Sequence, residues 1–302
     1  MLGILIPTKN RPEHVQRLLK SISRSDLSDS EIVLVASGLD IKYIVDSFEN
    51  ELKIKYFHVN QSGQINQKMI GISKFGKNVE WIMFLDDDLL VSQNLSHNIR
   101  RSTLHLKNAI GIGLKLPMKT RFNKKSRIMI YAARIFLLDS SEKGKLLKSG
   151  HAVSYMESSK ILETKWLSGA SIWKTEIAKK YNSVHPFSRY AAYEDVIFSH
   201  QVANLGTLYF DPSLEINFQE KQPDDITSTD AFISANYWRY FLVCSDEYFN
   251  FIQFLWSQLG RTIFFVLNHK NGSSIRILKS NLNILLNKVL RKSSITLLKK
   301  FC

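Results

Sequence analysis

The chain has 302 residues, of which 44% are hydrophobic and 23% are charged, a composition that excludes a disordered protein and allows a large buried core. Its two cysteines, Cys244 and Cys302, exclude a disulfide framework and a cysteine-rich zinc site, and they fit a reducing compartment. The net charge of +14 is uneven, because only basic charges follow Glu247, which indicates that this end of the chain meets an anionic surface.

The apolar run LGILI at the start has no basic segment before it, so it does not resemble a signal peptide. No stretch reaches the roughly 20 apolar residues that a membrane span needs. We therefore expect a cytoplasmic protein, either free or held peripherally on the inner face of the cell membrane.

Apolar runs and segments of helical periodicity alternate in the first third of the chain. Strands are predicted over 2–6, 31–35, 54–59 and 81–85. Helices are predicted over 11–22, 41–48 and 64–75. This alternation predicts an α/β fold with a mostly parallel central sheet and helices on its faces. The residues that follow the strands then share one edge of the sheet, which is where such folds bind ligands.

The rest of the chain is less regular. Its predicted elements are, in chain order, a basic loop over 121–127, a polar excursion or hairpin over 140–150, a helix after Thr175, a helix from about Tyr193 to Leu205, and a strand over 207–210 ending at Asp211-Pro212. The last third is rich in aromatic residues over 236–256. The segment 275–290 is predicted to form an amphipathic helix, whose apolar face carries Ile275, Leu278, Leu282, Leu285 and Val289.

Three acidic residues, Asp86, Asp87 and Asp88, directly follow the apolar run WIMFL. Like charges this close repel each other, so a cation or water must share the cluster. Mg²⁺ and Mn²⁺ prefer carboxylate oxygens and commonly bridge one or two carboxylates to substrate phosphates. The alternative is a solvated turn in which the aspartates cap a following helix. The position at the ligand edge of the sheet favours the metal.

The segment ILIPTKNR at 4–11, the strand ending in LDDD, and the later Glu194-Asp195 together resemble an inverting GT-A glycosyltransferase of family 2. The likeness covers about residues 1–220. It implies a GT-A fold with a C-terminal helical extension. The expected domains are a catalytic domain over 1–235, with a nucleotide-binding half (1–115) and an acceptor-binding half (116–235), and a basic helical region over 236–302.

The resemblance also assigns the nucleotide-sugar site. It implies that the nucleotide base is held by the loop after the first strand, through Pro7, Thr8, Asn10 and Arg11. Of the three aspartates, it implies that Asp86 contacts the ribose, that Asp87 belongs to the same nucleotide-sugar site, and that Asp88, with Asp86, holds Mn²⁺ or Mg²⁺.

Two further residues match the family pattern. Lys68 takes the place of an arginine in the helix that begins near Gly63, where a cation would face the nucleotide or its phosphates; the alternative is a surface lysine. Gly169 in WLSGASIW matches a turn beneath the donor sugar; the alternative is a tight structural turn.

The sequence departs from the family pattern at two places. Relatives bind the base with an aspartate that directly follows the second strand. In this sequence no carboxylate follows that strand before Asp40. The segment LEINFQE at 214–220 lacks the histidine that many relatives supply to the metal, which leaves Asn217, Gln219 or water to complete the ligands.

The pair Glu194-Asp195 is the candidate catalytic pair. Acidic residues are common in the first turn of a helix, so the pair alone predicts only a helix start. Downstream of the aspartates, and matching the family's Glu-Asp, it is expected to act on the acceptor. We assign Asp195 as the base that takes the proton of the attacking hydroxyl and Glu194 as a ligand of that hydroxyl, with exchanged roles as the alternative.

The predicted partners are a nucleotide-diphospho-sugar donor and a saccharide or lipid-linked acceptor. The basic, aromatic tail is expected either to lie on an anionic membrane surface or to form a helical oligomer interface. A nucleotidyltransferase on a related sheet is the first alternative, although ILIPTKNRPEH lacks the glycine-rich loop that such an enzyme needs. A nucleic-acid-binding protein is the second, and we expect no nucleic-acid partner because the tail's aromatic residues sit in apolar runs.

Overall fold

The computed structural model describes residues 1–60, 63–117, 127–183, 192–219, 228–268, 274–290 and 293–295. The chain divides into two compact units. The first contains Met1–Met118, Met156–Pro186 and Phe198–Gln222, and the second contains Lys119–Tyr155, Phe187–Ile197 and Pro223–Cys302. Residues 121–126 of the predicted basic loop lie outside the described residues. The domain boundary after residue 235 stays a prediction; a helix, α8, spans that position.

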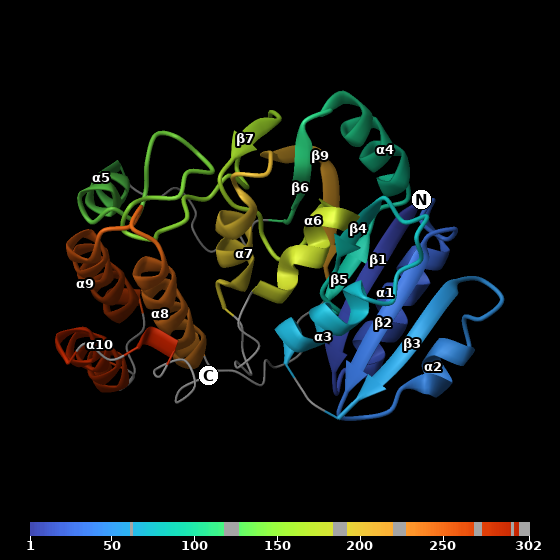
Figure 1. Ribbon diagram of the computed structural model, residues 1–302, viewed down its shortest axis with the longest axis horizontal. Helices are drawn as coiled ribbons and strands as arrows, with labels where there is room; N and C mark the ends of the chain where they lie inside the picture. The colour runs from blue at the N-terminus through green and yellow to red at the C-terminus, as the bar shows by residue number, and fades with distance from the viewer. Residues whose placement is uncertain are drawn as a thin grey trace. The chain divides into compact units, whose positions relative to one another are not determined.

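The first unit is built on a nine-stranded mixed sheet with the order β3-β2-β1-β4-β8-β6-β9-β5, and β7 also pairs with β9 (Figure 1). The strands β3, β2, β1 and β4 are mutually parallel, whereas β8 runs antiparallel to both of its neighbours. The strands are β1 (Leu2–Lys9), β2 (Glu31–Ser37), β3 (Lys53–Val59), β4 (Trp81–Phe84), β5 (Leu89–Val91), β6 (Ala109–Lys115), β7 (Leu162–Thr164), β8 (Ser171–Lys174) and β9 (Thr207–Phe218).

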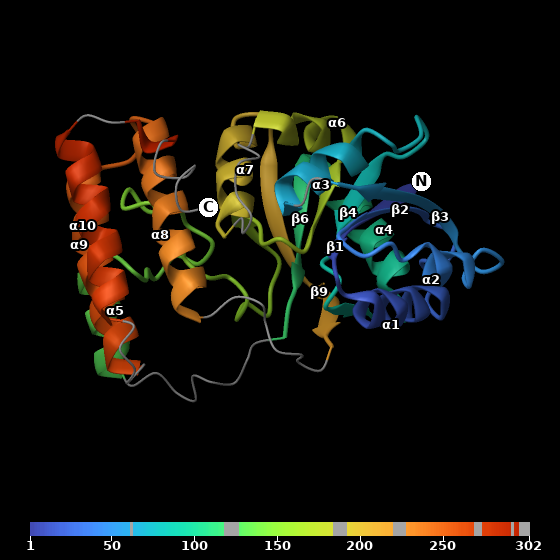
Figure 2. The same ribbon diagram turned by 90° about the horizontal axis from the view of Figure 1, so that it is seen from below.

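Helices cover both faces of this sheet, as Figure 2 shows. On one face α1, α2 and α4 pack against side chains such as Ile4 and Ile6 of β1. On the other face α3 packs against Leu5, because successive residues of a strand point to opposite sides. The helices of this unit are α1 (Pro12–Ser23), α2 (Lys42–Asp46), α3 (Gln64–Ile72), α4 (Leu95–His105), α6 (Thr175–Ala178) and the 3₁₀ helix η2 (Lys179–Ser183).

The predicted α/β fold is therefore confirmed, and the elements of the first third agree with their predicted positions to within a few residues. The last strand differs from its prediction. β9 continues through Asp211 and Pro212 to Phe218. A break in its pairing with β6 between Gly113 and Lys115 accommodates the proline, and Ser213 donates its backbone N–H to the Asp211 carboxylate there.

The second unit is helical. Its helices are α5 (Arg127–Ile135), the start of α7 (Glu194–Val202), α8 (Ser228–Ser245), α9 (Phe251–Asn268) and α10 (Ser274–Val289). Figures 1 and 2 show α5, α9 and α10 in one layer, with α8 against one face of that layer. The ring of Phe136, just after α5, packs on Trp256 of α9, and Gly260 leaves room for it. Among the described residues, no helix combines the length and the hydropathy that crossing a membrane requires.

Candidate functional site

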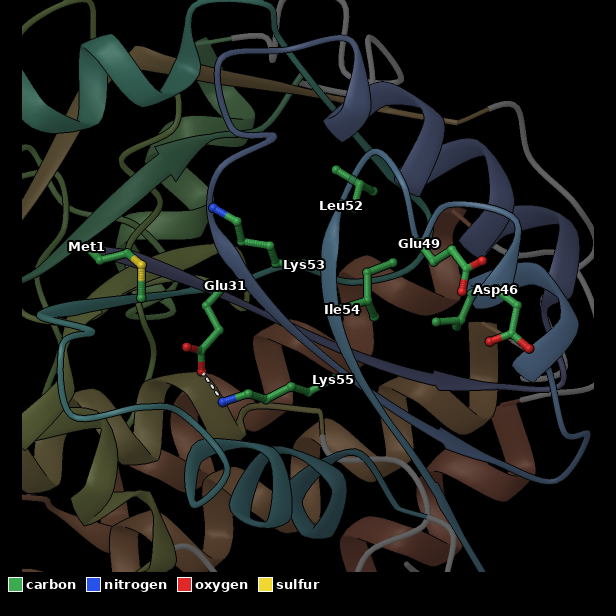
Figure 3. Close-up of a pocket in the computed structure, with 9 residues that line it drawn as sticks. Met1, Glu31, Asp46, Glu49, Leu52, Lys53, Ile54 and Lys55 are labelled. Carbon is green, nitrogen blue, oxygen red and sulfur yellow. Dashed lines mark hydrogen bonds and ion pairs between the residues drawn. The ribbon is translucent and has the colours of Figure 1, made fainter.

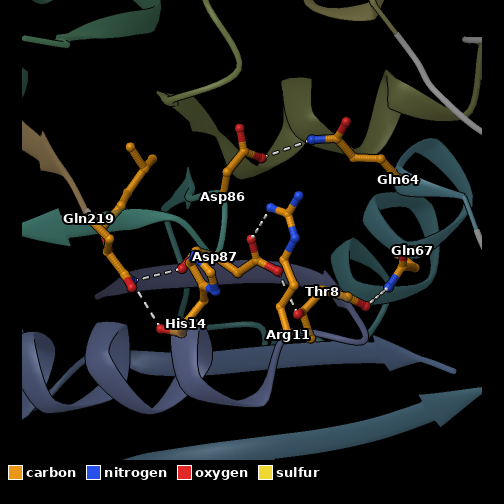
Figure 4. Close-up of polar contacts among 9 residues, drawn as sticks. Thr8, Arg11, His14, Gln64, Gln67, Asp86, Asp87 and Gln219 are labelled. Carbon is orange, nitrogen blue, oxygen red and sulfur yellow. Dashed lines mark hydrogen bonds and ion pairs between the residues drawn. The ribbon is translucent and has the colours of Figure 1, made fainter. Parts of the chain in front are cut away.

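Three neighbouring aspartates follow β4 at the carboxyl edge of the parallel strands, and each has a different environment. Figure 4 shows the contacts of Asp86 and Asp87. Asp87 is buried and binds one residue near the end of β1 and one just after it. Its carboxylate accepts a hydrogen bond of 2.6 Å from the Thr8 hydroxyl and forms an ion pair of 3.2 Å with Arg11. Asp87 therefore joins the ends of β1 and β4, and its oxygens are already occupied by protein partners.

Asp86 faces the start of α3 and the turn before β8. Its carboxylate accepts a hydrogen bond of 2.8 Å from the side chain of Gln64. A Cβ atom added to Gly169 would lie 3.5 Å from an Asp86 oxygen, an ordinary van der Waals separation, so the two residues are neighbours. The structure thus brings together Asp86 and Gly169, which the sequence assigned to the same nucleotide-sugar site.

Asp88 is half-buried, and its pKa is raised, as is that of the buried Asp87. Burial raises the pKa of Asp88 to about 6, and the neighbouring charges of Asp86 and Asp87 act in the same direction. The Arg11 guanidinium opposes this shift only partly. A carboxylate in this state gains most from a cation that binds to its ionised form.

The loops after β1 and β2 are tied to each other. Asn10 adopts a left-handed backbone conformation (φ 55°), which asparagine tolerates better than most residues, and its side chain accepts a hydrogen bond of 2.9 Å from the backbone of Leu39. Gly38 also has a positive φ of 79°, and an added Cβ would lie 2.0 Å from the Asn10 amide oxygen. The Asn10 side chain therefore occupies the space that a Cβ atom at position 38 would need.

The position of Pro7 and Thr8 differs from the prediction. The sequence placed both residues in the loop after the first strand, but β1 extends to Lys9 and contains them. Pro7 is tolerated there because β4 pairs with β1 only as far as Leu5, so the missing N–H of the proline leaves no ladder bond unmade on that side.

Two buried glutamines hold the backbone beneath the aspartates. Gln67 of α3 donates from Nε2 to the carbonyls of Thr8 and Val35, at 2.7 and 2.8 Å. Gln219, after β9, donates from Nε2 to the carbonyls of His14, Asp87 and Leu89, at 2.9 to 3.1 Å. Its backbone N–H also donates to the Asp88 carbonyl, at 2.8 Å. Sequence reasoning named Gln219 only as a substitute metal ligand and did not foresee this role.

Lys68 is not a surface lysine, so that alternative was wrong. Its side chain is 1% exposed, and its ammonium lies 5.3 Å from the ring centre of Phe84 and 5.7 Å from that of Tyr181. Contacts of this length are cation–π interactions. Lys68 lies on α3, one residue after the buried Gln67, and its side chain is enclosed by the end of β4 and by η2.

Glu194 and Asp195 begin α7 in the second unit, as the sequence predicted for a helix start. Glu194 is buried, and Asp195 is half-buried with one oxygen accepting the N–H of Val196 at 2.8 Å. The preceding Tyr193 has a φ of +83°, a costly conformation that concentrates at functional sites. Its hydroxyl donates to the Gly150 carbonyl and accepts the N–H of Ala152, both at 2.8 Å, which holds the helix start in place.

The aspartate run fits a hard divalent cation by the chemistry of its donors. Asp86 and Asp88 offer carboxylate oxygens, and burial, together with the charges of Asp86 and Asp87, raises the pKa of Asp88. Within the described ranges, no group of three histidine, cysteine, aspartate or glutamate side chains is arranged to enclose a metal ion. Mg²⁺ and Mn²⁺ do not need such a cage, since they commonly use one or two carboxylates and complete their shell with phosphate oxygens and water.

A separate cavity of about 490 Å³ lies at the opposite ends of the same strands (Figure 3). Met1, Glu31 and Lys53, which line it, stand at or near the starts of β1, β2 and β3. Glu31 is already paired with Lys55 at 2.8 Å. Ligands of parallel sheets bind beyond the carboxyl ends of the strands, so this cavity is not the candidate site.

Comparison with known proteins identifies the class of protein. Residues 3–149 match the family model described as Glycosyl transferase family 2. The fold is similar to TarS 1–349 of S. aureus in complex with UDP-GlcNAc (TM-score 0.60, 15% identity, 94% of this chain and 79% of that chain). It is also similar to the mannosyltransferase PcManGT of Pyrobaculum calidifontis in complex with GDP-Man and Mn²⁺ (TM-score 0.55, 11% identity, 99% and 84%). No curated protein sequence matches the chain.

The sheet, the aspartates at its ligand edge and these matches define an enzyme: the chain is a glycosyltransferase of the GT-A fold. Within that class it is similar to family 2, whose model matches the part of the chain that carries the aspartates.

Proposed function

We propose that the enzyme moves a sugar, with inversion at the anomeric carbon, from a nucleotide-diphosphate donor to a saccharide or lipid-linked acceptor in the synthesis of a surface polysaccharide or glycolipid. The observation that carries the proposal is the division of labour among the aspartates: Asp87 is held by Thr8 and Arg11, while Asp86 and Asp88 keep oxygens for a ligand. Solved structures of similar fold contain UDP-GlcNAc, or GDP-Man with Mn²⁺, which supports a nucleotide-sugar donor and a divalent metal.

In this mechanism the donor's diphosphate lies at Asp86 and Asp88, and the sugar lies over Gly169, the neighbour of Asp86. A bound Mn²⁺ or Mg²⁺ would supply positive charge that stabilises the departing nucleoside diphosphate. Asn10 and Arg11 are proposed to hold the nucleotide base, together with Pro7 and Thr8 at the end of β1.

The acceptor's hydroxyl oxygen forms the new bond to the anomeric carbon as the bond from that carbon to the diphosphate oxygen breaks. Asp195 takes the hydroxyl proton as the new bond forms, and Glu194 orients the hydroxyl. The proposed location is the cytoplasm, where a lipid-linked acceptor would be met at the inner face of the membrane.

Two substitutions test these roles. Asp88→Asn is expected to abolish donor binding and transfer, and Asp195→Asn is expected to abolish transfer while donor binding persists, because only the first residue touches the diphosphate site. The measurement is a thermal-shift panel of UDP-, GDP-, dTDP- and CMP-sugars with and without Mn²⁺, followed by detection of released nucleoside diphosphate. Normal turnover by either folded variant contradicts the role given to that residue. Release of pyrophosphate from a nucleoside triphosphate would instead support a nucleotidyltransferase.

A further inference from the structure

The second unit exposes apolar side chains along one face of α9. At about 100° per residue, the exposed positions occupy one arc of this helix, and the buried Phe254 and Ser257 lie on the opposite side. No charged or polar side chain lies within the exposed arc, whose members are Ile252, Trp256, Leu259, Ile263, Val266 and Leu267.

The next helix, α10, is oriented in the same way. The sequence predicted an apolar face on this helix, and in a water-soluble bundle that face would turn inward. The structure turns it outward, and the buried face instead carries Ile277, Ser280, Ile284 and Asn287. The exposed apolar residues of α10 and the residue after it are Ile275, Leu278, Leu282, Leu285, Leu286, Val289 and Leu290.

A network of polar side chains lies in the interior between α8, α9 and α10. Arg239 is fully buried and donates to the hydroxyl of Ser257 at 2.8 Å and to the amide oxygen of Gln258 at 3.2 Å. Gln258 donates to Asn281 at 2.8 Å, and Asn281 donates to the Thr262 hydroxyl at 2.8 Å. Apolar side chains such as Phe254 and Ile284 are buried beside this network, but many of the leucines and isoleucines of α9 and α10 face outward, whereas a helix bundle in water usually buries its apolar stripe.

Charge decides which partner covers this face. Lys279 is exposed on α10 among the apolar positions, Arg276 borders them and pairs with Asp230 of α8, and the sequence contains no acidic residue after Glu247. A second copy of the chain would bring the same cations to the rim of the interface, with no carboxylate from these helices to neutralise them. An anionic lipid surface complements both features, because its headgroups attract the cations and its acyl boundary accepts the leucines and isoleucines.

We propose that α9 and α10 form a docking surface for an anionic membrane, in whose plane they lie. The two helices have 18 and 16 residues, or about 27 and 24 Å at 1.5 Å per residue, and interfacial helices bury their apolar face about 5–10 Å into the headgroup region. This surface goes beyond the proposed function, since sugar transfer at the aspartate site does not require it.

Flotation of the full-length protein with vesicles tests the proposal. The wild type is expected to float with vesicles of phosphatidylcholine containing phosphatidylglycerol and to stay in solution with phosphatidylcholine alone. The variant Leu278→Gln/Leu282→Gln removes two leucines that are 58% and 54% exposed, so its fold is retained. We expect its partition to anionic vesicles to fall about tenfold or more, since burying one leucine side chain already stabilises by about 1.5–3 kcal/mol.

The matched control is Leu104→Gln, which changes an equally exposed leucine on α4 in the first unit and is expected to float like the wild type. Ile252→Gln/Ile263→Gln on α9 provides an independent second variant. The proposal is overturned if the wild type ignores anionic vesicles, if it binds neutral vesicles equally well, or if sedimentation shows a dimer that Leu278→Gln/Leu282→Gln dissociates. In the last case the face is an interface between two copies of the chain.

Discussion

At the scale of single residues, the three aspartates show how position separates identical side chains. Asp87 is neutralised by Arg11 and held by Thr8, so it acts as a structural joint. Asp86 receives one amide N–H from Gln64, and Asp88 has no comparable side-chain donor among the bonds described around it. We therefore propose that the first and last aspartates of the run are the ones that bind the ligand.

The pKa of Asp88 predicts a pH dependence. Its folded-state pKa of about 6 lies above the ordinary value of 3.8, so the protonated carboxyl favours the folded state, and this stabilisation is lost as the pH rises through about 6. The metal-free protein should therefore lose more thermal stability between pH 4.5 and pH 7.5, roughly, than Asp88→Asn does. Added Mn²⁺ should stabilise the wild type increasingly over the same range, because the metal binds the ionised form. Parallel melting curves for the two proteins at all pH values would contradict this assignment.

Gln219 gives a second prediction. Replacing it with leucine removes the donor that serves three buried carbonyls around the aspartates, so Gln219→Leu should lower the free energy of unfolding by about 1–3 kcal/mol. The Mn²⁺-induced thermal shift should fall as well, because the backbone on both sides of Asp88 loses its support. Urea unfolding measures the first effect. Gln16→Leu, on the exposed side of α1, is the control and should change stability by no more than about 0.5 kcal/mol.

Residue roles of this kind are only partly readable from the sequence. The run LDDD and the Glu-Asp pair could be singled out because carboxylates crowded after an apolar strand, or matching a family pattern, are unusual. Lys68 and Gln219 could not be placed, because their function depends on which distant backbone or ring lies beside them. The segment that forms α3 has polar residues on several sides, so its sequence does not show whether Lys68 is buried or exposed.

At the scale of elements, β1, β2 and β4 were predictable because they are buried on both faces and read as short continuous apolar runs, whereas the edge strand β3 alternates exposed and half-buried residues. The strands β5 and β7 have only three residues each, too few to show a pattern. β9 was predicted to end at Asp211-Pro212, a pair that normally signals a turn. Only the paired partner β6 reveals that the proline occupies an irregularity within a longer strand.

Close packing between β6 and β8 provides the element-scale prediction. A Cβ atom added to Gly111 would lie 2.7 Å from the indole ring of Trp173, which is buried and rigid. Gly111→Ala should therefore destabilise the fold by about 1–3 kcal/mol through overpacking, measured by urea unfolding. Gly76→Ala is the matched control, since its Cβ would meet only the flexible carboxylate of Glu31, and a change of similar size there would refute the packing argument.

At the scale of the whole molecule, donor chemistry and surface attachment are assigned to different units. We therefore expect Leu278→Gln/Leu282→Gln to bind nucleotide sugar and to transfer to a soluble acceptor like the wild type. We expect Asp88→Asn to float with anionic vesicles like the wild type. Thermal shift and flotation on both variants measure these expectations. Loss of both properties in either of these variants would show that the two activities are not separable.

Trp256 gives the exposed face of α9 an optical consequence. It is 44% exposed and donates its indole N–H to the carbonyl of Ile135 at 2.7 Å, whereas Trp173 and Trp238 are buried. Its emission should move to shorter wavelength when hydrocarbon replaces water around the ring, and brominated acyl chains should quench it while sparing the buried indoles. Trp256 is thus an intrinsic fluorophore on the surface that is proposed to contact lipid.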